Sequence, residues 1–353
     1  MNHKNNLLDE LIAHVVKESG SDLHLSEGRK PFIRVTGSLI PLVKYEALTK
    51  EDIVGFLDVF LTPENKEKFL ITKEADFSYG EHDIRFRGNC FFHQETISIA
   101  LRLIPKQIRT LVELNLPPIL EQFAQKQQGF FLVVGPVGQG KSTTLASMIE
   151  LINQTRAEHI VTIEDPIEYV YEPKKSIIDQ REIGVDTENF KIALRSMFRQ
   201  DIDVALVGEM RGPETIATAV TAAETGHLVF STLHTNTAAQ TIDRIIDSFP
   251  AEQQDQIRTQ LAGSLMGILS QRLVPRISGG MIPAFELLIN NSAVSNLIRE
   301  KRTYEINSVI ETGSQHGMIS LNKSLAELVR RGEITVENAR KFSLNESALE
   351  KLI

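Results

Sequence analysis

One glycine-rich stretch constrains the fold more than any other part of the chain. Residues 135–142 read GPVGQGKS and match the pattern G-x-x-x-x-G-K-[ST] at every fixed position. The apolar run at residues 130–134 precedes the stretch, and apolar residues at helical spacing, Leu145, Met148 and Ile149, follow it. Strand, glycine loop and helix therefore come in the order that a phosphate-binding loop requires.

Each residue type in this stretch can contribute to phosphate binding. Glycines let successive backbone N–H groups turn toward an anion, and the N-terminus of the next helix adds partial positive charge. Lys141 is expected to reach the β- and γ-phosphates, and the Ser142 hydroxyl is expected to ligate Mg²⁺. The stretch therefore predicts nucleoside triphosphate binding rather than a tight turn without a ligand. The predicted binding residues are Gly135, Pro136, Val137, Gly138, Gln139, Gly140, Lys141, Ser142 and Thr143.

Composition limits the classes of protein to consider. A chain of 353 residues predicts two or three domains, and a net charge of −8 argues against a surface that coats nucleic acid. The single cysteine, Cys90, excludes an internal disulfide and a multi-thiolate zinc site. The first residues lack a signal-peptide pattern, and every apolar run is shorter than the roughly 20 residues of a membrane span. We therefore expect a cytoplasmic protein.

Residues 1–105 predict a small α+β domain. Leu7, Leu11 and Val15 have helical spacing, and a second helix is expected to start after Thr49, with a break at Pro63. Short alternating segments predict strands. Prolines between residues 105 and 118 indicate a linker, which we place at residues 106–118. The expected strands are 22–25, 32–35, 84–87 and 97–101.

Three arginines of this first domain are candidate nucleotide contacts. Arg85 and Arg87 fall on one face of an alternating strand, and Arg102 follows another expected strand. A solvated strand face is the default interpretation of such charges. The sharper alternative is an arginine finger that stabilises charge on the γ-phosphate.

After the glycine loop, apolar strands alternate with helices, which predicts a parallel sheet. The expected strands are 160–163, 204–207 and 228–232. Glu164 and Asp165 end the first of these strands, on the edge of the sheet where ligands bind. Glu164 is a candidate either to orient the attacking water or to hold the metal. Glu209 follows the second strand, and it is a candidate for a water-mediated contact with Mg²⁺ or for polarising the attacking water, since Gly208 occupies the place of a common Mg²⁺-linked aspartate.

Two histidines, His227 and His234, frame the strand at residues 228–232. A lone histidine is more often a structural residue. A pair around one strand of this sheet favours a role for one of them in sensing the γ-phosphate.

The remainder of the chain predicts mainly helix. Ile257, Leu261, Leu265, Ile268 and Leu269 are expected to form one face of a long helix. Gly279–Gly280 is expected to separate the core from a C-terminal helical tail. The predicted organisation is an α+β domain at 1–105, a linker at 106–118, an α/β core at 119–275 and a mainly helical region at 276–353.

The order of four motifs resembles the secretion ATPase superfamily. GPVGQGKSTT, TIEDPIE, VALVGEMR and TAAETGHLVFSTLHTN resemble its Walker A, Asp box, Walker B and His box. GSDLHLS, RFRGN, AAQTIDRIIDSFP and AVSNLIRE extend the likeness over residues 1–345. Within the superfamily, the chain is most similar to the PilT family of type IV pilus retraction ATPases.

This resemblance implies a PAS-like N-terminal domain joined to a RecA-like P-loop ATPase core in a hexameric ring. It implies ATP and Mg²⁺ as cofactors, nucleotide between the two domains, and an inner-membrane pilus platform protein as partner, through which the ATPase associates with the membrane. It also implies hydrolysis coupled to pilus disassembly and twitching motility, without nucleic acid. The implied catalytic residues are Lys141, Glu164, Glu209, His227, His234, Arg85, Arg87 and Arg102, and the implied metal contacts are Ser142 and Glu209.

Two positions depart from the family pattern, and alternative functions remain open. Gln139 stands where relatives usually have serine, and Val294–Ser295 replaces an isoleucine–arginine pair, which removes one positive charge. A pilus assembly or type II secretion ATPase is an alternative, although such relatives commonly carry paired CxxC motifs and extra N-terminal domains. A RecA-like nucleic-acid motor is disfavoured because the chain has no Trp and only 6% aromatic residues. A nucleotide-binding subunit without hydrolysis is disfavoured by Lys141, Glu164 and Glu209.

Overall fold

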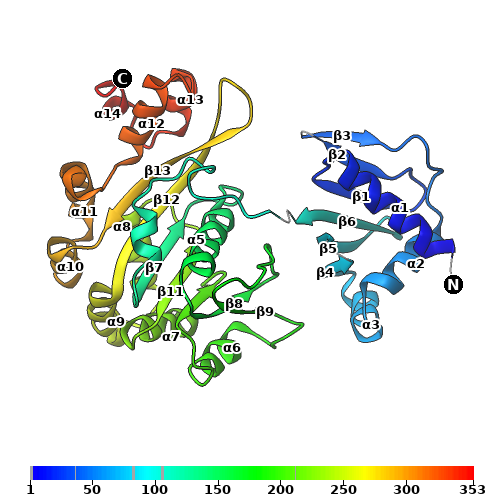
Figure 1. Ribbon diagram of the computed structural model, residues 1–353, viewed down its shortest axis with the longest axis horizontal. Coiled ribbons are helices and arrows are strands. Elements are labelled where there is room, and N and C mark those ends of the chain that lie inside the picture. The colour runs from blue at the N-terminus through cyan, green and yellow to red at the C-terminus, as the bar shows by residue number, and fades with distance from the viewer. Residues whose placement is uncertain (1–2, 36, 82–83, 105–106, 211) are drawn as a thin grey trace. The chain divides into compact units, whose positions relative to one another are not determined.

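The computed structural model describes residues 3–35, 37–81, 84–104, 107–210 and 212–353. The chain divides into two compact units, residues 1–107 with 168–170 and residues 108–167 with 171–353. Each unit has its own sheet (Figure 1). Each also has its own buried hydrophobic core. Pro105 and Lys106, which flank the expected linker boundary, lie outside the described residues.

The N-terminal unit contains a six-stranded sheet in the order β3-β2-β1-β6-β5-β4, with antiparallel pairing throughout. Its helix α2 starts where the sequence predicts, since the Thr49 hydroxyl accepts a hydrogen bond from the Asp52 N–H and the Asp52 carboxylate accepts one from the Thr49 N–H. The elements are α1 (His3–Lys17), β1 (Asp22–Ser26), β2 (Phe32–Val35), β3 (Ser38–Pro41), α2 (Lys50–Phe60), α3 (Pro63–Thr72), β4 (Glu74–Glu81), β5 (Ile84–His93) and β6 (Thr96–Ile104).

The core unit contains a seven-stranded sheet in the order β13-β12-β7-β11-β10-β8-β9, which is parallel except for the antiparallel edge strand β13. Strands β7, β10 and β11 are completely buried, as expected for parallel strands with helices on both faces. The expected α/β core is confirmed. Its elements are α4 (Leu120–Ala124), β7 (Gly129–Val134), α5 (Lys141–Thr155), β8 (His159–Glu164), β9 (Ile177–Glu182), α6 (Phe190–Met197), β10 (Val204–Val207), α7 (Pro213–Glu224), β11 (Leu228–Leu233), α8 (Ala238–Asp247), α9 (Ala251–Ser264), β12 (Leu265–Pro275) and β13 (Met281–Ile289).

The prediction of one long helix across residues 257–269 is wrong. Helix α9 ends at Ser264, and residues 265–275 form strand β12 between β7 and β13. Almost every side chain of β12 is buried, so its apolar run lacks the alternation that distinguishes a strand from a buried helix. At Gly267 the partner strand comes so close that a Cβ would lie 2.7 Å from the Leu288 carbonyl oxygen.

The residues around position 276 form a β-hairpin rather than a separation between two regions. Gly279 and Gly280 adopt φ values of 89° and 76° in the turn between β12 and β13. The Arg276 N–H donates to the Gly280 carbonyl oxygen at 3.0 Å. The core sheet therefore continues through Ile289, and the helical part of the C-terminal region begins at Ser292.

The C-terminal helices extend the core unit. Figure 1 shows α12, α13 and α14 gathered beside the β12–β13 hairpin, and Leu325 packs with Val274 and Ile282 in a small separate core. Among the described residues, none of the helices combines the length and apolar character needed to span a membrane. The C-terminal elements are α10 (Ser292–Arg299), η1 (Thr303–Glu305), α11 (Ile306–Thr312), η2 (Gly313–His316), α12 (Leu321–Arg330), α13 (Val336–Phe342) and α14 (Glu346–Glu350).

Candidate active site at the phosphate loop

The glycine loop joins β7 to α5, as its sequence predicts. Gly135, Gly138 and Gly140 have φ values of 145°, 75° and 78°, a region that side chains with a Cβ rarely adopt. Gly140 is also the residue that precedes the first turn of α5. The loop therefore places the N-terminus of a 15-residue helix at the carboxyl edge of the parallel sheet.

Lys141 folds back over the loop. Its side-chain ammonium donates to the carbonyl oxygens of Gly135 and Pro136, each at 2.8 Å, and lies 3.3 Å from Nδ1 of His234. Lys141 is only 8% exposed, so these polar partners offset the cost of burying its ammonium group. Ser142 and Thr143 are half-buried in the first turn of α5, and Val137 at the tip of the loop is 80% exposed.

Strand β12 holds the loop from its other side through Gln271. The Gln271 side-chain amide donates to the carbonyl oxygen of Gln139 at 2.7 Å, and its oxygen accepts from the Thr144 hydroxyl at 2.8 Å. The Gln139 side-chain oxygen accepts in turn from the Leu273 N–H at 2.6 Å. A Cβ at Gly135 would lie 2.5 Å from the Gln271 carbonyl oxygen, so glycine is required where the loop passes β12.

Gln271 was not predicted as a site residue, because a helix was expected in that part of the chain. The signal available in the sequence was the polar segment Ser270–Arg272 within an otherwise apolar run. All three of these side chains are buried. A buried polar group requires hydrogen-bond partners, so such a segment indicates a specific contact.

Glu164 stands at the end of β8 and is 8% exposed. Its Oε1 accepts hydrogen bonds from the Thr162 hydroxyl at 2.6 Å and from the Gln180 amide at 3.3 Å. Thr162 points in the same direction two residues earlier on the strand. The carboxylate is thus held in a fixed orientation by neighbours from β8 and β9.

Glu209 follows β10 and comes directly after Gly208, which lies close to the backbones of β8 and β11. The Gly208 N–H donates to the Ile163 carbonyl oxygen at 2.8 Å, and a Cβ at Gly208 would lie 3.3 Å from that oxygen. The Gly208 carbonyl oxygen accepts from the Thr232 hydroxyl at 2.6 Å. Glycine therefore fits between β8 and β11, and the carboxylate comes one residue later.

His234 connects the loop lysine with this carboxylate. Its Nδ1 lies 3.3 Å from the Lys141 ammonium, and its Nε2 lies 3.4 Å from Oε1 of Glu209. Because an ammonium can only donate, Nδ1 is the acceptor and the proton belongs on Nε2, facing Glu209. Lys141, His234 and Glu209 therefore form one line of polar groups in close contact across the carboxyl edge of the sheet.

The segment that carries His234 is fixed by β12 and β13. The Ser270 hydroxyl donates to the Asn236 carbonyl oxygen, and Arg272 donates to the Asn236 side-chain oxygen, both at 2.8 Å. Oε1 of Glu286 accepts from the Ala238 N–H at 2.8 Å at the start of α8. Burial raises the pKa of Glu286 and lowers the pKa of Arg272, although each of these two charged groups partly offsets the effect on the other.

Of the two histidines that frame β11, His234 contacts Lys141 and Glu209, whereas His227 lies at the other end of the strand. It precedes β11 at the opposite edge of the sheet, where its carbonyl oxygen accepts from the Gly129 N–H. The six residues of β11 separate it from His234 by about 20 Å along the strand. Its Nδ1 lies 3.0 Å from the Ala222 carbonyl oxygen, and its ring contacts Phe198 edge-on.

The three candidate arginines lie in the N-terminal unit. Arg87 and Arg102 are direct cross-strand partners in β5 and β6, and Arg85 lies two residues before Arg87 on the same face of β5. Nε of Arg102 donates to a carboxylate oxygen of Asp22 at 2.9 Å, although the Arg102 side chain remains 72% exposed. The arginines thus form a cationic group on one face of the N-terminal sheet.

Comparisons with known proteins agree with this fold. The family model for type II/IV secretion system proteins matches residues 2–343. The type IV pilus retraction ATPase PilT of Pseudomonas aeruginosa is 43% identical over 95% of this chain and 97% of its own length. A twitching motility protein of Neisseria gonorrhoeae is 44% identical over 90% of this chain and 86% of its own length. A crystal structure of the pilus retraction motor PilT with bound ADP superposes with a TM-score of 0.90, at 44% identity, and the match covers 97% of this chain and 98% of that one.

The fold and the phosphate loop define a nucleotide-binding P-loop protein of the α/β class. The extent of the family match, together with the identity over nearly the whole chain, then specifies the family. The chain belongs to the type II/IV secretion system protein family, within its PilT group.

Proposed function

We propose that this protein is an ATP hydrolase that works as the retraction motor of a type IV pilus. The observation that carries the proposal is the line Lys141–His234–Glu209, which joins a phosphate-binding cation to a carboxylate at the mouth of the loop. Glu164 supplies a second, rigidly held carboxylate on the neighbouring strand. The relatives named as pilus retraction and twitching motility proteins support the biological role.

Phosphate binding would use the loop N–H groups, the N-terminus of α5 and Lys141. The Lys141 ammonium exchanges a loop carbonyl contact for an oxygen of the β- or γ-phosphate. The binding residues in this proposal are those predicted from the sequence, Gly135, Pro136, Val137, Gly138, Gln139, Gly140, Lys141, Ser142 and Thr143.

Magnesium fits this site only in company with the nucleotide. Among the described residues, no group of three or more His, Cys, Asp or Glu side chains is suited to hold a metal alone. Mg²⁺ typically keeps several waters and is bound through one or two protein groups with substrate phosphates. We place Ser142 as its protein ligand and Glu209 as its contact through water, and the ion would neutralise charge that develops on the phosphates.

In the hydrolytic step, the two carboxylates orient and polarise the attacking water. Glu209 accepts a hydrogen bond from that water, and the Nε2–H of His234 keeps the carboxylate directed into the site. Glu164 holds the water or the Mg²⁺ shell from the β8 side. Preorganised groups of this kind act without reorganising at the moment of reaction, which is the main source of their catalytic effect.

Arg85, Arg87 and Arg102 are proposed to complete the site in a hexameric ring. Their shared face presents several guanidinium groups, and such groups stabilise charge on a transferring phosphoryl group. Mixing an inactive Arg→Ala variant with an inactive Glu209→Gln variant tests whether they act between subunits. Recovered ATPase activity in mixed rings supports action in trans, and its absence excludes it.

The experiment that tests retraction itself uses a strain of the source organism that lacks this protein. A retraction motor predicts loss of twitching with abundant surface pili, because assembly continues. An assembly ATPase predicts loss of both pili and twitching, and a type II secretion ATPase predicts loss of secretion. Complementation with Glu209→Gln must fail to restore twitching if ATP hydrolysis drives the process.

A nucleic-acid motor remains the alternative from another class, and it is tested directly. Stimulation of the ATPase by single-stranded DNA or RNA would favour that alternative. We expect no stimulation, since the chain is acidic overall and contains no Trp. The proposed partner is instead an inner-membrane platform protein of the pilus, to which the ring binds from the cytoplasmic side.

A further inference from the structure

The N-terminal sheet has one face that its own helices cover and one that they do not. Leu23 and Leu25 of β1 belong to the same buried core as Leu11 of α1 and Phe56 of α2. Alternate residues of the strands, among them His24, point to the other face. That second face carries the arginines at one end and a cavity at the other.

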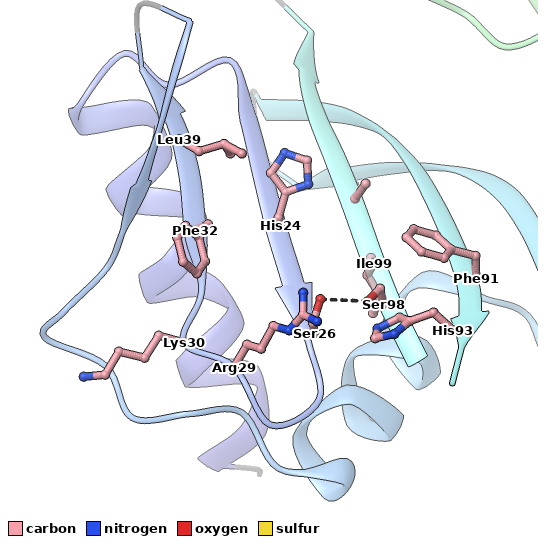
Figure 2. A pocket seen from close by; sticks show the side chains of 11 residues that line it. His24, Ser26, Arg29, Lys30, Phe32, Leu39, Phe91, His93, Ser98 and Ile99 are labelled. Atoms are coloured by element: carbon pink, nitrogen blue, oxygen red, sulfur yellow. Dashed lines mark hydrogen bonds between the residues drawn. The ribbon is translucent and has the colours of Figure 1, made fainter. Parts of the chain in front are cut away.

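The cavity has a volume of about 410 Å³ and spans five adjacent strands, β3, β2, β1, β6 and β5. This volume falls within the usual range of small-molecule sites. Figure 2 shows Phe32 and Phe91 on either side of the pair formed by Ser26 and Ser98. Phe32 lies on β2 and Phe91 on β5, so three strand spacings, about 14 Å, separate their backbones.

Every side chain that lines the cavity is either basic or neutral. Arg29 and Lys30 follow β1, and His93 ends β5, whereas no Asp or Glu is among the residues that line the cavity. Lys30 donates to the Val43 carbonyl oxygen, a neutral acceptor, at 3.0 Å. Arg29 is exposed, and no hydrogen bond or ion pair of its side chain occurs among the described residues. An anion is the ligand that such a lining attracts.

Two polar groups at the floor of the cavity still offer hydrogen bonds. Nε2 of His24 is buried without a hydrogen-bond partner among the described residues, a situation that is costly unless a ligand or water meets it. The Ser26 and Ser98 hydroxyls lie 2.7 Å apart, so one donates to the other and the second keeps an O–H to donate. Burial lowers the pKa of His24 more than Asp22 raises it, which keeps the imidazole neutral.

We propose that this cavity binds a small aromatic anion of about two rings. Its rings lie between Phe32 and Phe91, and its carboxylate or phosphate group faces Arg29, His24 and the serine pair. The ring system accounts for the distance between the two phenylalanines, and the oxyanion accounts for the cationic rim and the available donors. Such a ligand binds apart from the phosphate loop, so the proposal does not depend on ATP hydrolysis.

The test is a fluorescence titration of the full chain with 1-anilinonaphthalene-8-sulfonate, a two-part aromatic anion. The protein is first saturated with ADP and Mg²⁺, so that the phosphate loop is occupied. We expect one saturable site per chain and at least a tenfold weaker affinity in Arg29→Glu. Lys50→Glu is the matched control, because Lys50 is the exposed first residue of α2 and the charge change is identical.

Competition identifies the oxyanion. Displacement of the probe by 2-naphthoate supports a carboxylate ligand, and displacement by 1-naphthyl phosphate supports a phosphate ligand. Absence of a saturable site, or equal weakening by Arg29→Glu and Lys50→Glu, overturns the proposal. Probe binding only after the assembly dissociates into single chains also overturns it, because another copy of the chain then covers the cavity.

Discussion

The two edges of the core sheet differ in the side chains that lie at the ends of their strands. At the carboxyl edge, β7, β8, β10 and β11 end close to Lys141, Glu164, Glu209 and His234, and His234 contacts both Lys141 and Glu209. At the opposite edge, His227 contacts only backbone and an aromatic ring among the described groups. We therefore expect the position of a residue along a parallel strand to decide its role more than its type does. The following predictions test this division.

The largest effect is expected at Lys141. Lys141→Ala removes the cation that faces the phosphates, and we expect the ATPase rate to fall by at least about 10³-fold with loss of nucleotide affinity. Phosphate release and binding of a fluorescent ATP analogue measure the two quantities. A variant that still hydrolyses ATP at a tenth of the parental rate would exclude the proposed lysine contact.

Glu209→Gln should separate binding from hydrolysis. The amide keeps the size of the side chain but no longer polarises water, so we expect ATP binding near the parental level and a rate about 10²–10³-fold lower. Equilibrium binding beside phosphate release provides the measurement. Parental turnover in this variant would show that Glu209 has no catalytic role.

The two histidines provide the sharpest contrast between the edges. His234→Ala interrupts the line from Lys141 to Glu209, and we expect kcat to fall by about 10–100-fold. His227→Ala, the matched control at the other edge, is expected to change kcat less than threefold, with its effect confined to thermal stability. Equal losses of kcat in both variants would contradict the division between the edges.

A smaller effect is expected when β12 releases the phosphate loop. Gln271→Leu removes the contacts with Gln139 and Thr144 while retaining an apolar, strand-compatible side chain. We expect KM for ATP to rise several-fold, with a smaller change in kcat, because the loop is less well ordered before phosphate binds. Gln271→Glu keeps the acceptor for the Thr144 hydroxyl but loses the N–H that donates to the Gln139 carbonyl oxygen, and it places a negative charge beside the phosphate loop, so KM should rise at least as much as in Gln271→Leu. Parental KM values in both variants would show that this contact does not order the loop.

The smallest effect on hydrolysis is expected at α10. Asn291 caps this helix, Val294, Leu297 and Ile298 are buried, and Asn296 and Arg299 are exposed. Ser295 donates to the Ala262 carbonyl oxygen at 2.8 Å, which ties α10 to α9. These contacts hold the segment firmly on the core unit.

We propose that the exposed side of α10 couples the ATPase to the pilus machinery. Arg299→Ala should change ATP hydrolysis less than twofold while weakening twitching, and Asn296→Ala should behave in the same way. Twitching zones are compared with ATPase rates of the purified variants. If ATP hydrolysis and twitching fall together, or if neither falls, α10 is a helix packed on the core without a coupling role.

Local patterns in the sequence predicted the elements whose signals are short and strong. The glycine loop predicted β7 and α5, and the signals at Thr49 and Pro63 predicted α2 and α3. Strand β9 went unrecognised because it is short and half exposed. Strand β12 was misassigned because burial on both faces removes the alternation on which strand prediction depends.

The sequence predicted which residues belong to the site better than it predicted which of them contact one another. Lys141, Glu164 and Glu209 follow from motifs that lie at strand ends. The link from His234 to both Lys141 and Glu209 depends on distances across three strands, which no local pattern contains. The same reason explains why Gln271 escaped notice, since its partner Gln139 is 132 positions away in sequence.

The folded-back lysine has a consequence for selectivity. The three N–H groups of the Lys141 ammonium already have acceptors in two carbonyl oxygens and one imidazole nitrogen. A ligand that offers only another neutral oxygen therefore gains nothing by displacing them. A phosphate gains because a full negative charge replaces a dipole beside a buried cation. The loop thus selects phosphates over neutral ligands, because only a charged oxygen binds the ammonium better than the carbonyl oxygens do. The many neutral hydroxyl and carbonyl compounds of the cell therefore do not compete for Lys141.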